Sequence, residues 1–139
     1  MKIINKQKDF YFLRFDLGEE AIGGIKEFCR KQKIKSAYFS VIGAVSEVLL
    51  SFYNLKTKKY EDKLVKKELE ITTATGNITH LRQEIIIHCH GNFSDNKMTV
   101  VGGHVKKMVV SGTCEVVFSV MDKKIMRAYD ERTGLNLMA

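Results

Sequence analysis

The stretch Ile85–His90 reads IIIHCH, and a second short stretch, Gly102–His104, reads GGH. These two stretches hold three of the four histidines of the chain. In an extended strand successive side chains point to opposite faces, so His88 and His90 share one face while Cys89 lies on the other. The apolar run and this alternation therefore predict a strand with two imidazoles on one surface.

The second stretch belongs to a predicted strand over 98–105, which runs back antiparallel to the first after a turn at 94–96. With a three-residue turn, His104 falls opposite Ile86 and diagonal to His88, on the same face. Diagonal neighbours on adjacent strands lie roughly 7–8 Å apart. A loop that is one residue longer or shorter, or a bulge at the glycine pair, would send His104 to the other face.

Three imidazoles on one face are typical of a metal site. Histidine nitrogens bind zinc and other divalent transition metals, and three protein ligands leave the fourth tetrahedral position open. We therefore predict that His88, His90 and His104 hold zinc or a similar ion. Two alternatives stay open: a distorted strand could bring the sulfur of Cys89 to a soft metal, or the cluster is empty and the chain serves as a scaffold.

An open coordination position would hold water, and zinc lowers the pKa of such a water to about 7. Glu115 is a candidate general base and Arg127 a candidate clamp for an anionic substrate. Glu84, on the histidine strand, is a candidate partner for the second nitrogen of a ligating imidazole. The competing interpretation makes Glu115 an ordinary strand carboxylate and Arg127 part of an ion pair between subunits.

Length and composition predict one globular domain over residues 1–139, because the chain is 45% apolar and long enough to bury a core. No stretch approaches the roughly 20 apolar residues of a membrane span, and residues 1–10 lack the apolar centre of a secretory signal. We expect a cytoplasmic protein that does not bind membranes. Its three cysteines form no paired motif, so we expect buried, reduced thiols.

The formal net charge of +7 would attract polyanions such as DNA. Lysines account for most of this charge and are spread along the chain, and no helix-turn-helix, zinc-finger or ribonucleoprotein motif is present. A solvated basic surface explains the charge equally well, so DNA binding through this surface stays one of two interpretations.

The remaining pattern predicts an α+β fold, with about eight or nine mostly antiparallel strands packed against one main helix. A first strand over 10–17 is followed by a helix that opens at Glu19 and ends near Lys33. Gly43 is expected to separate two strands, and the stretch 76–80 is expected to be a loop that exposes a histidine. The other predicted strands are 37–42, 48–53, 60–65, 68–73, 83–93, 98–105, 113–120 and 125–129.

Several of these motifs, read in order, resemble the PPC family, the plants-and-prokaryotes-conserved domain. The resemblance covers nearly the whole chain, and its most specific parts are the His-x-His and Gly-Gly-His elements. It rests on residues 16–20, 43–45, 76–78, 88–90, 102–104, 113–117, Arg127 and 133–135.

The resemblance implies a strongly curved sheet packed with the helix, a homotrimer, and a metal held by the three histidines. In plant members an AT-hook contacts DNA, but this chain contains neither an Arg-Gly-Arg-Pro core nor any proline. Two functions follow as expectations. The first is a metal-binding homotrimer with a regulatory or DNA-associated role. The second is a metal-dependent enzyme, of hydrolase or lyase type, acting on a small anionic substrate.

Overall fold

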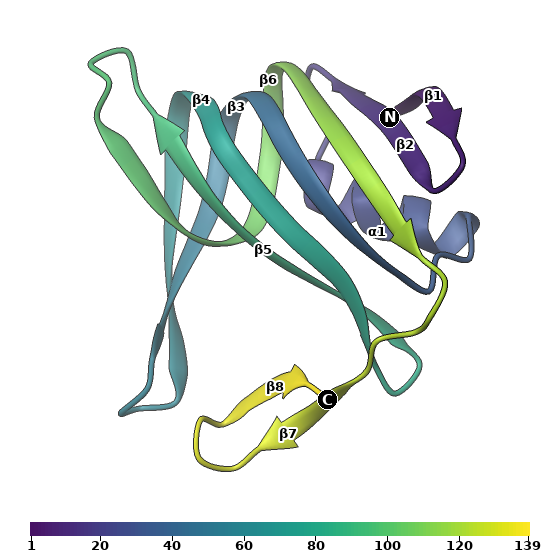
Figure 1. Cartoon of the computed structure of the whole chain (residues 1–139). Coiled ribbons are helices and arrows are strands. Elements are labelled where there is room, and N and C mark those ends of the chain that lie inside the picture. Colours follow the sequence, from purple (N-terminus) through teal and green to yellow (C-terminus); the bar gives the residue numbers. More distant parts are fainter.

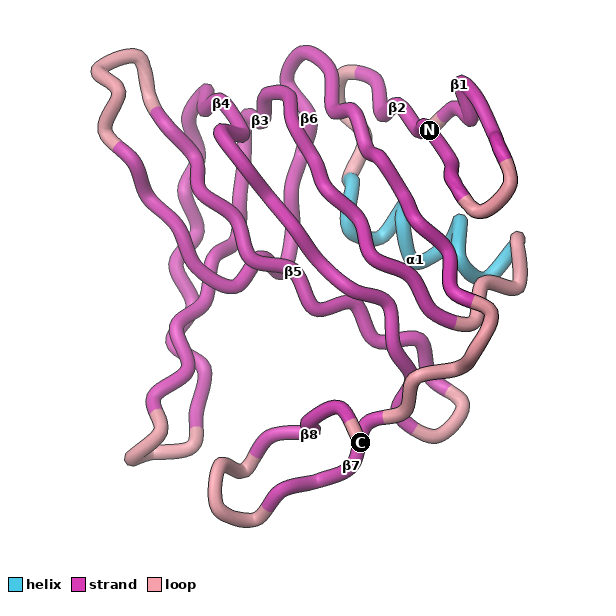
Figure 2. Tube along the Cα trace, in the orientation of Figure 1, coloured by secondary structure: helices cyan, strands magenta, loops and turns pink.

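A computed structural model describes residues 1–139 as eight strands and one helix (Figures 1 and 2). Six strands form one curved antiparallel sheet in the order β1-β2-β6-β3-β4-β5, and β5 also pairs with the first residues of β6. The last two strands form a separate hairpin. The predicted α+β class, with a mostly antiparallel curved sheet and one helix, is confirmed. The elements are β1 (Lys2–Gln7), β2 (Phe10–Asp16), α1 (Ala21–Lys31), β3 (Ser36–Asn54), β4 (Lys59–Leu81), β5 (Glu84–Ser94), β6 (Val100–Met121), β7 (Arg127–Asp130) and β8 (Leu135–Met138).

Three of the strands are much longer than the sequence pattern predicts. Gly43, expected to end a strand, instead lies inside β3 at a point where the register with β4 and β6 shifts. The stretch 76–80, expected to be a loop, lies inside β4. A glycine inside a strand often marks a bulge rather than an end, and a bulge lets a long strand bend with the sheet. The strand predictions therefore found the right segments but divided them too often.

The helix α1 packs its apolar side against the sheet. Glu20 precedes its first turn, and its side chain accepts hydrogen bonds from the backbone N–H groups of Ile22 and Gly23. The predicted acidic start of the helix is thus a cap, which satisfies backbone donors that have no partner within the helix. Phe28 of the helix makes edge contacts with the rings of Tyr11 and Phe118 on the sheet.

The core lies between this helix and the sheet and contains 26 buried apolar residues. All three cysteines belong to it and are unpaired, as predicted. Burial raises the pKa of each thiol to about 12, so the thiols stay protonated and unreactive near neutral pH. The structure contains no helix with the length and apolar character needed to cross a membrane.

Candidate metal centre

The histidines come together where β5 pairs with the start of β6. His90 lies directly opposite His104, and Ser94 lies opposite Val100. The loop between the strands is longer than predicted. The Asp95 side chain stabilises this longer loop, because it accepts hydrogen bonds from the backbone N–H groups of Lys97 and Thr99.

The predicted register, with His104 opposite Ile86, is therefore wrong by four residues. An even shift keeps every side chain on its original face, since faces alternate with a period of two. His104 consequently shares a face with His88 and His90, while Cys89 is buried in the core on the other side.

The three imidazoles each direct one nitrogen toward a common point. One ring nitrogen of each lies within 4.8 Å of the corresponding atoms of the other two. The Nε2 atoms of His88 and His90 are 3.1 Å apart. Two nitrogens at tetrahedral positions around a metal, each bonded at about 2.0–2.1 Å, are separated by about 3.3 Å. The cluster thus fits a tetrahedral ion with only small side-chain adjustment, and three imidazoles are a donor set that suits zinc and related metals.

The surroundings of the cluster favour neutral imidazoles, which is the form that binds metals. Burial, with smaller contributions from His88 and His90, lowers the pKa of His104 to about 4. Burial also lowers the pKa of His88, with smaller effects from His90 and from Arg127.

The negative charge of the Asp62 carboxylate acts on His104. It raises the pKa of that imidazole and so favours the protonated ring, against the larger effect of burial. The carboxylate accepts a hydrogen bond from the Ser51 hydroxyl at 2.5 Å and pairs with Lys106 at 2.7 Å. Ser51 lies opposite both His104 and Asp62. The sequence analysis missed Asp62, although a β3–β4 hairpin turning at 55–58 already pairs it with Ser51.

Arg127, predicted as an anion clamp, does lie beside the cluster. Its Nη2 is 3.5 Å from Nδ1 of His88. Its other contacts are Nε to the Thr79 hydroxyl at 2.7 Å, Nη1 to the Asn136 carbonyl at 2.7 Å and Nη2 to the Asn77 side-chain oxygen at 3.2 Å. Asn77 and Thr79 lie on the histidine face of β4, because Asn77 pairs with His88. The sequence analysis placed both in a loop and so missed them.

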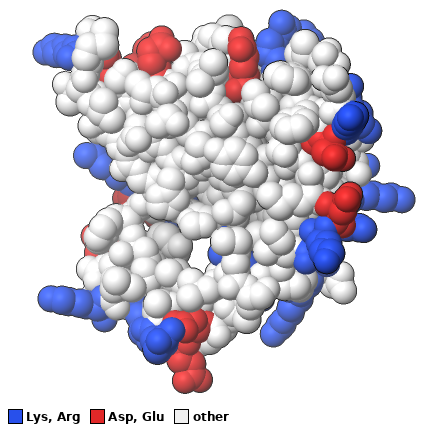
Figure 3. All heavy atoms as spheres, viewed as in Figure 1, with Lys and Arg blue, Asp and Glu red and all other residues white.

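A cavity of about 470 Å³ opens beside His88 and His104. The β7–β8 hairpin forms one of its walls, and Figure 3 shows the surface hollowed next to this hairpin. The cavity has cations and tyrosine hydroxyls at some positions and aliphatic side chains at others. Its lining residues are Tyr53, Lys58, Tyr60, Leu81, Ile86, Ile87, His88, His104, Lys106, Arg127, Gly134, Leu135, Asn136 and Leu137.

The remaining candidates lie elsewhere. Glu115 faces Arg14 and Ile42 across neighbouring strands and lines a different cavity, which none of the histidines reaches. Glu84 is exposed at the start of β5, and no hydrogen bond or ion pair joins it to the cluster. The structure brings neither carboxylate to the histidines.

The fourth histidine, His80, was expected in an exposed loop, and this expectation is wrong. Its side chain is buried inside β4, and neither ring nitrogen has a hydrogen-bond partner. His80 does not belong to the cluster.

The family model for the Plants and Prokaryotes Conserved (PCC) domain matches residues 4–122. No curated protein matches the chain. Among solved structures, the chain is similar to a "putative DNA binding protein" from Bacteroides thetaiotaomicron, with a TM-score of 0.94 and 29% identity over 97% of this chain and 94% of that one.

Two archaeal structures are also similar. A metal-containing protein from Archaeoglobus fulgidus has a TM-score of 0.86 and 28% identity, over 99% of this chain and 96% of that one. A plant- and prokaryote-conserved (PPC) protein from Pyrococcus horikoshii has a TM-score of 0.86 and 27% identity, over 94% of this chain and 90% of that one.

Proposed function

Because this chain belongs to the Plants and Prokaryotes Conserved (PCC) domain family, we propose that it is a single-domain, metal-binding homotrimer of the cytoplasm. Its ion, zinc or another divalent transition metal, is held by His88, His90 and His104. The observation that carries the proposal is the convergence of three imidazole nitrogens within 4.8 Å. The metal-containing relative from Archaeoglobus fulgidus supports it.

Elemental analysis tests this proposal when the protein is purified without a histidine tag or added metal. We expect one transition-metal ion per chain, and we expect His104→Ala to lose it because two imidazoles bind far more weakly than three. His80→Leu is the matched control, since it removes the one histidine outside the cluster and should keep the ion. Metal-free wild-type protein that also fails to take up added zinc would leave only an empty scaffold.

The outer face of the sheet supports self-association. Phe12, Val117 and Ile42 are exposed on neighbouring strands of this face, and Arg14 lies directly opposite Glu115 within it. Figure 3 shows the broad centre of the surface almost free of charged residues, with charged residues of both signs at its rim. An exposed apolar area of this kind typically marks a protein interface. Other copies of this chain are suitable partners for this exposed area, because the area contains both an acidic and a basic group that can pair with the opposite charges of another copy.

The similar protein from Bacteroides thetaiotaomicron suggests a regulatory role in which this chain contacts DNA. The net charge of +7 supports electrostatic contact with phosphates. Titration of a labelled duplex should then give an affinity that falls steeply as salt rises. No binding at about 50 mM salt, where phosphate contacts are weakly screened, would remove this role.

A second function, that of a metal-dependent enzyme of hydrolase or lyase type, is favoured by the cavity beside the cluster. A zinc ion held by these three imidazoles would supply a polarising charge and a bound water with a pKa of about 7. Arg127 would orient a small anionic substrate against His88, and the aliphatic wall of the cavity would exclude bulk water. No hydrogen bond or ion pair joins a carboxylate to the histidines, so a group of the substrate would accept the proton that the reaction releases.

A further inference from the structure

We propose that the cavity next to the cluster is a site for a small monocarboxylate with a short apolar body, whose carboxylate is held by Arg127. This inference rests on the proposed metal centre and names the kind of ligand that reaches it. It is carried by three features of the cavity: an uncompensated guanidinium, an aliphatic wall and the hairpin that encloses both.

The first feature is the charge of Arg127. Its guanidinium is half-buried, and every atom that it contacts belongs to a neutral group: a hydroxyl, an amide oxygen, a backbone carbonyl and an imidazole. Charges removed from water are normally paired, because an unpaired one loses its hydration. A ligand carboxylate is the partner that this site lacks, and its planar oxygens match the guanidinium geometry.

The other two cations of the cavity differ from Arg127. Lys106 is already neutralised by Asp62, with 2.7 Å between the nearest atoms. Lys58 is exposed, and its ammonium donates to the backbone carbonyl of Glu131. The cavity therefore offers one concentrated positive charge beside the histidines, which favours a ligand with a single negative group over a polyphosphate.

The second feature is a set of aliphatic side chains that lines the cavity together with these charged groups. The ligand therefore has an apolar part, because burying that part against aliphatic side chains is favourable while burying a second polar group there is costly. A volume of about 470 Å³ lies within the usual range for small-molecule sites. The wall residues are Leu81, Ile86, Ile87, Leu135 and Leu137.

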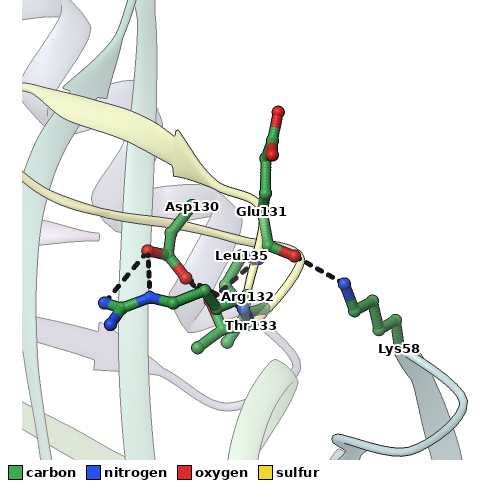
Figure 4. Close-up of polar contacts among 6 residues, drawn as sticks. All are labelled: Lys58, Asp130, Glu131, Arg132, Thr133 and Leu135. Carbon is green, nitrogen blue, oxygen red and sulfur yellow. Dashed lines mark hydrogen bonds and ion pairs between the residues drawn. The ribbon is translucent and has the colours of Figure 1, made fainter.

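The third feature is the β7–β8 hairpin, which forms one side of the cavity. At one end Arg127 binds β4, and at the other the Tyr53 hydroxyl donates to the Thr133 carbonyl at 2.8 Å. Figure 4 shows Lys58 reaching the Glu131 carbonyl, and Asp130 accepting hydrogen bonds within the turn of the hairpin. These contacts hold Arg127 in place before any ligand binds.

The test uses the full-length protein loaded with Co(II), whose visible absorption spectrum responds to changes at the metal. We expect added butanoate to change the spectrum until the site is saturated. The affinity for butanoate should be higher than the affinity for inorganic phosphate. Arg127→Gln should weaken butanoate binding at least tenfold while it keeps one Co(II) per chain. Arg132→Gln is the matched control, because it removes the same charge from the same hairpin at an exposed position and should leave the affinity unchanged.

A second measurement covers the case in which Arg127→Gln fails to fold. In the wild-type protein, paramagnetic relaxation of the labelled carboxyl carbon of butanoate by Co(II) should show that this carbon binds close to the metal. The conservative Arg127→Lys should weaken butanoate binding, because lysine cannot make the bidentate contact of a guanidinium. A wild-type protein that takes up no Co(II) overturns the metal centre itself. A loaded protein that ignores butanoate, prefers phosphate or binds equally well after Arg127→Gln overturns only the carboxylate site.

Discussion

His80 is a neutral histidine enclosed by the protein. It is 7% exposed, and neither of its ring nitrogens has a hydrogen-bond partner. Burial lowers its pKa, and the nearby ammonium of Lys124 adds to the effect, while the backbone at Ile34 and Lys35 acts weakly in the opposite direction. The folded protein therefore resists protonation of this ring more than the unfolded chain does.

This imbalance predicts a loss of stability in acid. The unfolded chain takes up a proton at His80 as pH falls below about 6.5, while the folded form takes it up only at lower pH, so the free energy of unfolding decreases. Above that pH both states are neutral and the residue contributes no pH dependence. Urea unfolding between pH 7.5 and 5 should show a slope that is smaller in His80→Leu than in the wild type, by up to about 1.4 kcal/mol per pH unit. Identical slopes would mean that the ring takes up its proton over the same pH range in the folded protein as in the unfolded chain, and would contradict the lowered pKa.

The histidine cluster shows which residue-scale features can be predicted. Alternation along one strand placed His88 and His90 together, and it separated them from Cys89, with no knowledge of the partner strand. The position of His104 along the sheet could not be predicted, because it depends on a loop that Asp95 stabilises through its own hydrogen bonds. Its face was nevertheless predicted correctly, since the error in register was even.

Among the elements, β3 depends most on a single residue. Gly43 has a φ of +135°, which side-chain-bearing residues rarely adopt, and a Cβ there would lie 2.1 Å from the Thr113 carbonyl oxygen. The bulge at this point lets β3 continue past its partner β6 with a changed register. A residue with a side chain would strain the backbone and force the two strands apart.

We therefore expect Gly43→Ala to lower the free energy of unfolding by about 3 kcal/mol, as estimated from the cost of a strained backbone conformation plus local displacement. Chemical denaturation measures this change. Gly112→Ala is the matched control on the partner strand, because a Cβ there meets nothing closer than 4.0 Å, and it should change stability little. Equal stability of the two variants would contradict the bulge as the reason for this glycine.

The strands that the sequence failed to predict share a physical cause. Both β1 and β8 consist mostly of exposed residues, so neither has the alternation of buried and exposed positions that reveals a strand. Each forms because a neighbouring strand offers backbone hydrogen-bond partners, β2 in one case and β7 in the other. The helix, in contrast, was predictable because its buried positions recur with the helical period and it ends in basic residues.

At the scale of the whole molecule, the outer face of the sheet determines assembly in our proposal. Ile42 is 59% exposed at its centre, so a charged residue there costs the single chain little but would be buried between copies. We expect Ile42→Lys to convert trimers to monomers in light scattering coupled to size-exclusion chromatography. Phe52→Lys changes a somewhat more exposed apolar position on the β3–β4 hairpin and should leave trimers intact. Trimers that survive Ile42→Lys unchanged would place the interface elsewhere.

The cavity belongs to this scale too, because its residues come from six strands, β3 to β8, and from the β3–β4 and β7–β8 turns. The sequence singled out Arg127 by its chemistry, but not its partners Asn77 and Asn136, which are ordinary polar residues in their own segments. Their convergence follows from the curvature of the sheet and from the hairpin that spans it. Such long-range placement leaves no local signal in the sequence.

The proposed metal centre requires that the three imidazoles bind one ion. X-ray absorption spectroscopy at the edge of the metal found in the purified protein tests this claim directly. We predict scattering from three imidazoles with nitrogen at about 2.0–2.1 Å and one further light atom, a pattern that His104→Ala would abolish. A sulfur neighbour at about 2.3 Å, or fewer than three imidazoles around the ion, would contradict the account.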